Sequence, residues 1–205
     1  MQIIEPSYKI LTEIDPTRIM SNIERAGRTA YKSEDRITSG SAERLIKDII
    51  KRGHESVLEH EYLSIKFICD RGVSHEIVRH RLCAFTQEST RYCNYSGKGI
   101  TVIKPLFWNR SSTEYGIWYN AMEQCEDRYN LLILNGATPQ EARSVLPNSL
   151  KTEIVVTANI REWRHILTLR TSKAAHPQMR QIMIPLLTKL KLLLPVLFGD
   201  ININE

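Results

Sequence analysis

A short stretch of the chain combines side chains of the types and spacing that an anion site needs. Arg79-His80-Arg81 is followed, after seven residues, by Ser89 and then by Arg91. Arginine stays charged at any working pH, and its planar fork of donors matches the oxygens of a phosphate or carboxylate. A serine hydroxyl adds a small donor for the same group. The pattern indicates an anion site, although runs of arginine are also typical of solvated helix faces.

Two further arginines stand beside apolar residues. Arg143 follows Ala142 in a helix that is expected to bury its small side chains, so we expect Arg143 near the core. Arg170 projects close to the apolar side of its helix, where an unpaired guanidinium is costly. We therefore expect Arg170 to meet either an internal carboxylate or a bound anion, and the sequence leaves both options open.

Capping residues and periodicity predict the elements that must position these side chains. In the first half of the chain we expect a helix from Asp15-Pro16 to about Tyr31, an amphipathic helix over Leu45–Ile50 that stops at Gly53, and a strand over Tyr62–Cys69. Ser74 is expected to cap a short helix that carries Glu76, Arg79 and His80. Glu76 would then be a surface partner of Arg79 or His80.

The second half predicts a strand at Thr101–Ile103, a helix over Glu114–Leu134, a helix from the Thr138 capping box to Pro147, a strand over Lys151–Thr157, and a final helical stretch from Pro177, kinked near Pro185. Asn159 caps a further helix, with Arg161 and His165 on its polar face and Ile160, Trp163 and Leu167 on its apolar face. No linker or repeat divides the chain. We therefore expect a single α+β domain over residues 1–205.

Composition narrows the class of protein. The chain has 205 residues, 42% of them hydrophobic, and a formal charge of +5. This charge suits an enzyme for anionic small molecules at least as well as a nucleic-acid binder. No apolar run approaches the roughly 18 residues that span a bilayer, and no signal-peptide pattern begins the chain, so we expect a cytoplasmic protein that does not bind membranes. The four cysteines form no Cys-x-x-Cys pair, which favours reduced thiols.

Two familiar kinds of site are disfavoured by spacing. The histidines at 54 and 60 do not form a His-Glu-x-x-His motif, because position 58 is Leu58, and we expect no metal. Gly97-Lys98-Gly99 is the nearest approach to a dinucleotide-binding glycine loop, but it precedes no helix. A flavin or nicotinamide would therefore be held by arginine forks and helix N-termini.

With these segments in view, the chain resembles the flavin-dependent thymidylate synthases. The signature of that family is Arg-His-Arg, seven residues and Ser, matched here by Arg79-His80-Arg81 and Ser89. Four more blocks agree in order and spacing: Gly53–His60, Ser89–Tyr92, Glu141–Pro147 and Asn159–Arg170. Together they cover most of the span from Gly53 to Arg170.

The resemblance implies an α+β fold with a mixed or antiparallel sheet flanked by helices, and a homotetramer whose FAD sites are shared between subunits. It implies conversion of dUMP to dTMP, with methylenetetrahydrofolate as carbon donor and NADPH as the source of reducing equivalents for FAD. It implies no nucleic-acid partner.

The resemblance also assigns residues to ligands. For dUMP they are Glu76, Arg79, Gln87, Glu88, Ser89, Thr90, Arg91, Arg143 and Arg170. For FAD they are Ser56, Arg79, His80, Arg81, Gln87, Asn159, Ile160, Arg161 and His165. His54 falls near the folate and flavin, and Arg170 falls beside the uracil ring as the catalytic residue.

The chain departs from the family pattern at three of these positions. Position 76 is Glu where several members have Gln, position 87 is Gln where many have Glu, and position 165 is His where some have Asn. These replacements keep hydrogen-bonding reach but change charge. Two other interpretations stay open: a basic nucleic-acid-binding module and a thymidylate synthase that uses a cysteine nucleophile.

Overall fold

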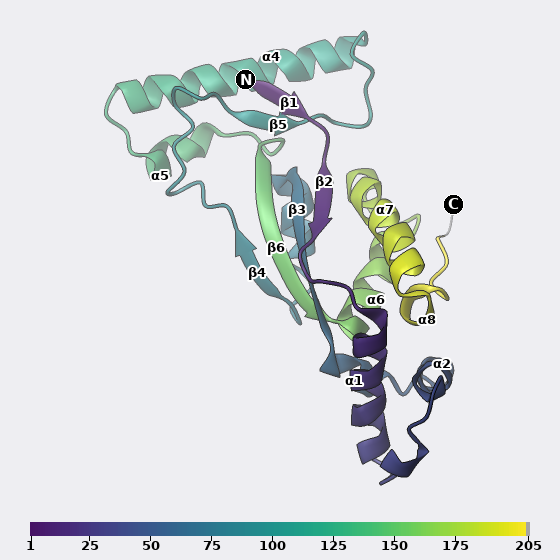
Figure 1. The fold of residues 1–205 in the computed structure, drawn as a ribbon. Coiled ribbons are helices and arrows are strands. Elements are labelled where there is room, and N and C mark those ends of the chain that lie inside the picture. The colour runs from purple at the N-terminus through teal and green to yellow at the C-terminus, as the bar shows by residue number, and fades with distance from the viewer. Residues whose placement is uncertain (204–205) are drawn as a thin grey trace. The chain divides into compact units, whose positions relative to one another are not determined.

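The computed structural model describes residues 1–203, which form an α+β fold (Figure 1). The chain divides into two compact units. The first unit comprises Met1–Tyr8, Lys66–Arg79 and Phe85–Val155. The second comprises Lys9–Ile65, His80–Ala84 and the chain from Val156 onward. Strands β3 (Tyr62–Asp70) and β6 (Lys151–Asn159) contribute to both units, and a single domain over residues 1–205 stays a prediction.

The second unit is mainly helical. Its helices are α1 (Pro16–Thr29), the 3-10 turn η1 (Glu34–Arg36), α2 (Ser41–Arg52), the 3-10 helix η2 (Glu55–His60), α6 (Ile160–Arg170), α7 (Pro177–Leu193) and α8 (Pro195–Phe198). As predicted, Asp15 caps α1, accepting a hydrogen bond from the Arg18 N–H. Gly53 ends α2 with a φ of 70°, a conformation that glycine adopts without steric cost. Helices α1 and α2 pack against each other (Figure 1).

The first unit contains a parallel pair of strands and a long helix. Its elements are β1 (Gln2–Ile4), α3 (Arg71–Ile77), β5 (Thr101–Ile103), α4 (Thr113–Leu134), α5 (Pro139–Ala142) and the 3-10 turn η3 (Arg143–Val145). β1 pairs with β5 in parallel, with Ile3 opposite Val102. Figure 1 shows α4 alongside this pair. Trp118 and Met122 of α4 pack with Val102 in an apolar core cluster.

A four-stranded sheet has the order β2-β3-β6-β4, where β2 is Ser7–Ile10 and β4 is Ala84–Gln87. Side chains alternate along its long strands. On β6, Thr152 and Ile154 are buried, whereas Lys151, Glu153 and Val155 are only partly buried. Because successive side chains point to opposite faces of a sheet, one face of β6 is apolar and the other carries charge. The α+β class predicted from the sequence is confirmed, with an antiparallel sheet and flanking helices.

The short helix before the Arg-His-Arg motif differs from the prediction. α3 begins at Arg71, and its cap is Asp70, whose carboxylate accepts from the Val73 N–H at 2.7 Å. Ser74 is not the cap: its hydroxyl donates to the Arg71 carbonyl. The helix ends at Ile77, so Arg79 and His80 lie beyond it. Glu76 is partly buried, and its expected pairing with Arg79 or His80 stays a prediction.

Three other expectations need adjustment. The predicted helix from Thr138 to Pro147 is shorter, because α5 gives way to the η3 turn. Arg143 is exposed rather than near the core, whereas Ala142 beside it is fully buried. The short strands β1, β2 and β4 were not predicted. Among residues 1–203, no helix has both the length and the apolar character that crossing a bilayer requires.

Arg164 of α6 ties the segment after α8 to the second unit. This side chain is 8% exposed, and its guanidinium donates to both carboxylate oxygens of Asp200 at 2.7 Å. It also donates to the Leu197 carbonyl and lies 3.4 Å from a Glu55 oxygen. Burial disfavours the charged form, but the pairing with Asp200 outweighs it and raises the pKa of Arg164. The contacts give Arg164 a structural role.

We expect Arg164→Met to lower the free energy of unfolding by about 2–3 kcal/mol, because it removes hydrogen bonds to charged groups at a buried position. The matched control is Arg161→Met on the same helix. Arg161 pairs with Glu59, and the side chains of the two residues are 50% and 42% exposed. Exposed pairs contribute about 0–1 kcal/mol. Urea unfolding of both variants measures the difference, and equal losses would contradict the structural role of Arg164.

Candidate functional site

The second unit brings Arg170 and His80 together from positions ninety residues apart in the sequence. Arg170 is the last residue of α6, and His80, 6% exposed, follows the end of α3. The Arg170 Nε–H donates to His80 Nε2 at 2.9 Å. The sequence predicted a carboxylate or an anion as the partner of Arg170. The structure shows a hydrogen bond to a third kind of group, an imidazole. The accepting Nε2 carries no proton, which leaves the His80 proton on Nδ1.

His80 is neutral at ordinary pH. Burial, and then the positive charges of Arg170 and His165, lower its pKa from 6.5 to about 4. Its Nδ1 faces a carboxylate oxygen of Glu162 at 3.6 Å, a distance that qualifies as an ion pair only for a charged histidine. Because the imidazole is neutral, we interpret this contact as a polar approach of the Nδ1–H to Glu162. Burial raises the pKa of Glu162.

Glu162 and His165 also give His80 the geometry of a possible metal site. One ligand atom from each of the three residues lies within 4.8 Å of the others. The spacing argument from the sequence did not examine this combination. However, the fixed charge of the Arg170 guanidinium, bonded to the same imidazole, opposes a metal cation there. The arrangement favours an anionic or neutral ligand.

A cavity of about 710 Å³ lies beside this cluster in the second unit. The residues that line it are Glu55, Glu59, Tyr62, Leu82, Asn159, Arg161, Glu162, Arg164, His165 and Thr168. Asn159, the predicted helix cap, accepts from the Glu162 N–H at 2.8 Å. Tyr62 and Leu82 are 56% and 76% exposed and offer apolar surface. The cavity therefore combines polar groups at a helix N-terminus with apolar walls, as small-molecule sites do.

Several residues that the sequence assigned to the flavin lie in this unit. Asn159, Arg161 and His165 line the same cavity, and His165 meets His80 edge to face, with ring centres 5.8 Å apart. Arg81 is exposed. Ile160 has a fully buried side chain, and its N–H donates to the Glu61 carbonyl, so neither group is available to a ligand.

Two further predicted residues lie on or beside η2. His54 and Ser56 are exposed and flank Glu55, but they do not line the cavity. Their assignments stay predictions.

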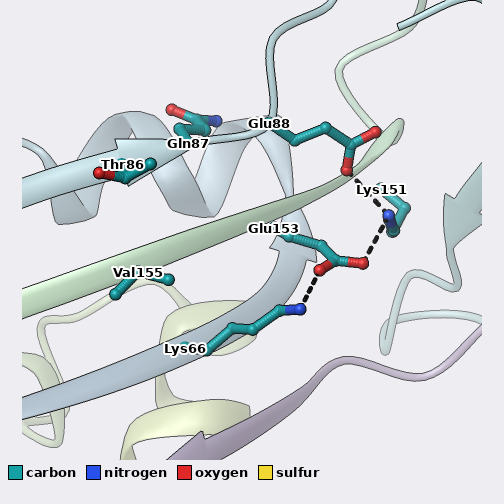
Figure 2. Close-up of a pocket in the computed structure, with 7 residues that line it drawn as sticks. All are labelled: Lys66, Thr86, Gln87, Glu88, Lys151, Glu153 and Val155. Atoms are coloured by element: carbon teal, nitrogen blue, oxygen red, sulfur yellow. Dashed lines mark hydrogen bonds and ion pairs between the residues drawn. The ribbon is translucent and has the colours of Figure 1, made fainter. Parts of the chain in front are cut away.

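The first unit holds most of the residues that the sequence assigned to dUMP. Gln87 is the last residue of β4 and Glu88 follows it, and their side chains point in different directions (Figure 2). Gln87 donates to Ser74 Oγ at 2.9 Å and to Thr152 Oγ1 at 3.1 Å, so its amide nitrogen is held by the unit itself. Glu88 faces a second cavity, of about 440 Å³. Both residues line this cavity, but their side chains are bonded to different residues of β6, Gln87 to Thr152 and Glu88 to Lys151.

The second cavity carries a chain of alternating charges. Figure 2 shows Glu88 paired with Lys151, Lys151 with Glu153, and Glu153 with Lys66. The Lys151 Nζ lies 2.8 Å from Glu88 and 2.9 Å from Glu153. The four charges sum to zero, and all are engaged with one another. This cavity is therefore a poor site for an anion, although it borders the predicted one.

Ser89 and Thr90 form a compact turn after Glu88. The Ser89 hydroxyl oxygen accepts from the Arg91 N–H at 3.3 Å. Thr90 is buried, and its hydroxyl oxygen accepts from Arg143 at 3.4 Å. This contact joins two segments that the sequence separates by fifty-three residues and that the prediction assigned to one nucleotide.

The arginines differ in whether they make an ion pair with a carboxylate of the chain. Some arginines pair with a carboxylate of the chain, as Arg28 does with Glu24 at 2.9 Å. In contrast, nine exposed arginines make no ion pair with any residue in the described part of the chain: Arg25, Arg36, Arg44, Arg79, Arg81, Arg91, Arg110, Arg128 and Arg143. Four of the nine, Arg79, Arg81, Arg91 and Arg143, were predicted to bind dUMP or FAD. An exposed guanidinium without a carboxylate partner keeps its full charge for an external anion.

Sequence reasoning missed three residues that organise these clusters. Glu162 faces His80, and Lys151 and Tyr95 bind Glu88. The sequence indicated Glu162 only as a residue in the first turn of the helix that Asn159 caps, and Lys151 only as the start of a strand. The alternation along β6 was a usable signal, since it places Lys151 and Glu153 on one face.

We expect the protein to lose stability as the pH falls from about 6.5 to about 4, in part because of His80. Its folded pKa of about 4 lies below the ordinary 6.5, so over this range the unfolded state binds the proton and the folded state does not. His80→Gln keeps an acceptor for Arg170 but binds no proton, and it should reduce the loss. His60→Gln, at an exposed histidine, is the control. The free energy of unfolding is measured across this pH range for each variant. If its dependence on pH were the same in His80→Gln as in the unaltered protein, the lowered pKa of His80 would not be the cause of the loss.

Comparison with known proteins supports the family that the motifs indicated. Residues 14–196 match the family described as thymidylate synthase complementing protein. A flavin-dependent thymidylate synthase of Geobacter sulfurreducens is 31% identical over 182 residues, covering 85% of this chain and 78% of that protein. One from Corynebacterium efficiens is 30% identical over 215 residues, covering 97% of this chain and 86% of the relative.

The fold has a close counterpart among solved structures. A UMP/dUMP methylase, PolB, from Streptomyces cacaoi, bound with 5-Br dUMP, matches with a TM-score of 0.81 and 22% identity. The match covers 97% of this chain and 96% of that one. At this identity the likeness establishes a shared fold. With the sequence matches, it follows that the chain belongs to the flavin-dependent thymidylate synthases, a family of methyltransferases.

Proposed function

We propose that this protein methylates dUMP to dTMP, with methylenetetrahydrofolate as carbon donor and with FAD reduced by NADPH as the source of hydride. Family membership supports the reaction class. The observation that carries the proposal is that Arg79, Arg81, Arg91 and Arg143, which the motifs assign to ligands, are exposed and make no ion pair among the described residues, because dUMP, the folate tail and the FAD pyrophosphate are all anions. We also propose a cytoplasmic homotetramer in which FAD sites are shared between subunits.

The dUMP phosphate is assigned to the turn after β4 and to Arg143. Ser89 uses its oxygen as an acceptor for the Arg91 N–H, so its hydroxyl hydrogen is available to a phosphate oxygen. Arg143 approaches Thr90 of the same turn. Arg79 and Arg91 supply further exposed cations. Glu76 and Gln87 keep their assignment to the nucleotide as predictions from the resemblance.

Arg170 is assigned to the uracil ring. Negative charge develops on the pyrimidine as its C5 attacks the one-carbon unit, and a fixed cation beside the ring stabilises that charge. The hydrogen bond from Arg170 Nε to His80 holds the guanidinium in one orientation before the substrate arrives. Such preorganisation avoids reorienting a flexible arginine during the reaction.

The residues of the second unit fit a flavin at its 710 Å³ cavity. Asn159 and His165 offer hydrogen-bonding groups, and Tyr62 and Leu82 offer apolar surface for a planar ring. When bound, FAD supplies the hydride that completes the methyl group. Because Arg161 is paired with Glu59, we assign the FAD pyrophosphate to the unpaired Arg81 of this unit, and the assignment of Arg79 to FAD stays a prediction from the resemblance. His54 is assigned to the folate side of the flavin.

The environments of Cys69, Cys83 and Cys125 argue against any of these three as the nucleophile of a cysteine-dependent thymidylate synthase. Burial raises the pKa of Cys69 and of Cys83 to about 12, and it also raises the pKa of Cys125. A thiol with a raised pKa forms little of the reactive thiolate at neutral pH. The flavin mechanism needs no covalent bond from the enzyme to the substrate, so it agrees with these environments.

The direct test is a flavin assay on the purified protein. We expect yellow protein whose absorbance near 450 nm is bleached by NADPH and restored when dUMP and methylenetetrahydrofolate are added, with dTMP as the product. UMP is the comparison substrate, since the solved relative is described as a UMP/dUMP methylase. Colourless protein that binds RNA or DNA with steep salt dependence would support the nucleic-acid interpretation instead.

We expect Arg170→Ala to retain FAD but to lower turnover by about 100-fold or more, the range for removing one preorganised charge-stabilising donor. Arg170→Lys keeps the positive charge but loses the Nε donor that binds His80. Its turnover should lie between that of Arg170→Ala and that of the unaltered protein. Steady-state rates at saturating dUMP, with flavin content measured by absorbance, provide the comparison. Unchanged turnover in Arg170→Ala would remove its catalytic role.

A further inference from the structure

We propose that Glu88 is a positioning residue rather than a substrate ligand, and that Tyr95 and Lys151 hold it so that the turn Ser89–Arg91 keeps its shape for dUMP. We call these three side chains the Glu88 clamp. The inference rests on the proposed function, because it concerns the turn assigned there to dUMP.

Both side-chain oxygens of Glu88 are already engaged. The Tyr95 hydroxyl donates to Oε1 at 2.8 Å, and the Lys151 ammonium donates to Oε2 at 2.8 Å. The Glu88 N–H donates to the Glu153 carbonyl, also at 2.8 Å. A carboxylate that accepts from two partners within its own unit has little capacity left for a nucleotide. A direct contact with an anionic phosphate would in addition be repulsive.

The clamp joins both ends of the turn to the sheet. Glu88 directly precedes the turn, and Tyr95 follows it. Lys151 belongs to β6, whose alternation sets its side chain on the same face as Glu153 (Figure 2). The Tyr95 N–H also donates to the hydroxyl of Tyr129 on α4 at 3.3 Å. The turn is thus fixed at its start by β6 and at its end by both Glu88 and α4.

The protonation states of the clamp suit this role. Burial, and then the hydrogen bond to Glu88, raise the pKa of Tyr95, so the phenol stays protonated and donates. Burial alone would lower the pKa of Lys151, but its hydrogen bonds to Glu88 and Glu153 outweigh this and raise it. Both donors therefore keep their protons at neutral pH. With side chains 17% and 20% exposed, Glu88 and Lys151 are shielded from much of the screening that weakens surface pairs.

Within the turn, backbone contacts depend on the position of Ser89. The Ser89 carbonyl accepts from the N–H groups of Tyr92 and Cys93 at 3.2 and 3.0 Å. The Ser89 hydroxyl oxygen accepts from the Arg91 N–H. Releasing Glu88 would free the residue directly before this small network. Arg91 and the Ser89 hydroxyl would then lose their shared orientation, and a ligand would have to restore it at an entropic cost.

The experiment compares Lys151→Met and Tyr95→Phe with the control Lys66→Met. Lys66 lies at the far end of the same charge chain and pairs with Glu153, so its replacement removes an equal charge without touching Glu88. Lys151→Arg, which keeps a charged donor, serves as the rescue variant. Hydrogen–deuterium exchange is measured on the free full-length protein, and dUMP affinity is measured by calorimetry.

We expect the amides of Tyr92, Cys93 and Tyr95 to exchange about tenfold faster in Lys151→Met and Tyr95→Phe, as the loss of one hydrogen bond to a charged group implies. The dissociation constant for dUMP should rise about tenfold in both, with flavin content and turnover at saturating dUMP close to those of the unaltered protein. Lys66→Met should change neither quantity, and Lys151→Arg should restore much of both.

Three results would overturn the proposal. Unchanged exchange in Lys151→Met would show that the clamp does not order the turn. Equal effects in Lys66→Met would show a general effect of charge. Faster exchange with unaltered dUMP affinity would show that the order of the turn does not serve binding. If the unaltered protein bound no dUMP, the proposed function would fail along with this inference, whereas exchange measured without ligand would still report whether the clamp exists.

Discussion

The cost of leaving a charge without a partner is the constraint on which this structure depends. Where arginine is buried, as at Arg164, the fold surrounds it with carboxylates and a carbonyl. Where lysine and glutamate share a half-buried face, as at Lys151, they form a chain of alternating charges that sums to zero. Many arginines without such a partner lie at exposed positions, where water solvates the guanidinium and a bound anion can replace that water. Arg79, Arg81, Arg91 and Arg143, which the motifs assign to ligands, belong to this exposed group.

Strand alternation gives the second organising rule. Gln87 and Glu88 are neighbours in the sequence and were assigned to the same nucleotide, yet their side chains bind successive residues of β6, Thr152 and Lys151, which alternate in direction. Gln87 consequently reaches Ser74 and Thr152 on the buried side, whereas Glu88 reaches the charged side of β6. A replacement of Glu by Gln at position 87 is therefore compatible with the fold, because an amide can donate to two hydroxyl groups and a carboxylate cannot. The departure from the family pattern changes the chemistry of the buried face as well as that of the site.

Local signals predicted the elements whose ends are fixed by nearby residues. Asp15 and Gly53 carry enough information in themselves to place the start of α1 and the end of α2. Ser74 misled the prediction for α3 because Asp70, at the end of a strand, is the stronger cap, and its role depends on where β3 stops. Short strands such as β1 were missed because three residues have no measurable period, and their pairing with β5 comes from a segment about a hundred residues away. Motif spacing, by contrast, brought Thr90 and Arg143 into one prediction, and the structure places these two residues in contact, whereas their role in binding stays a prediction.

The contact between His80 and Arg170 shows what lies beyond such signals. Residue types alone suggested that a guanidinium at the apolar side of α6 would meet a carboxylate or an anion, because those are its strongest partners. A neutral imidazole is a weaker partner, but it can orient the guanidinium without cancelling its charge. The arrangement is stable only while the imidazole stays neutral, and burial together with Arg170 itself ensures this by lowering the pKa of His80 to about 4. The central histidine of the Arg-His-Arg motif thus acts here as a hydrogen-bond acceptor whose neutrality is maintained by the same cation that it orients.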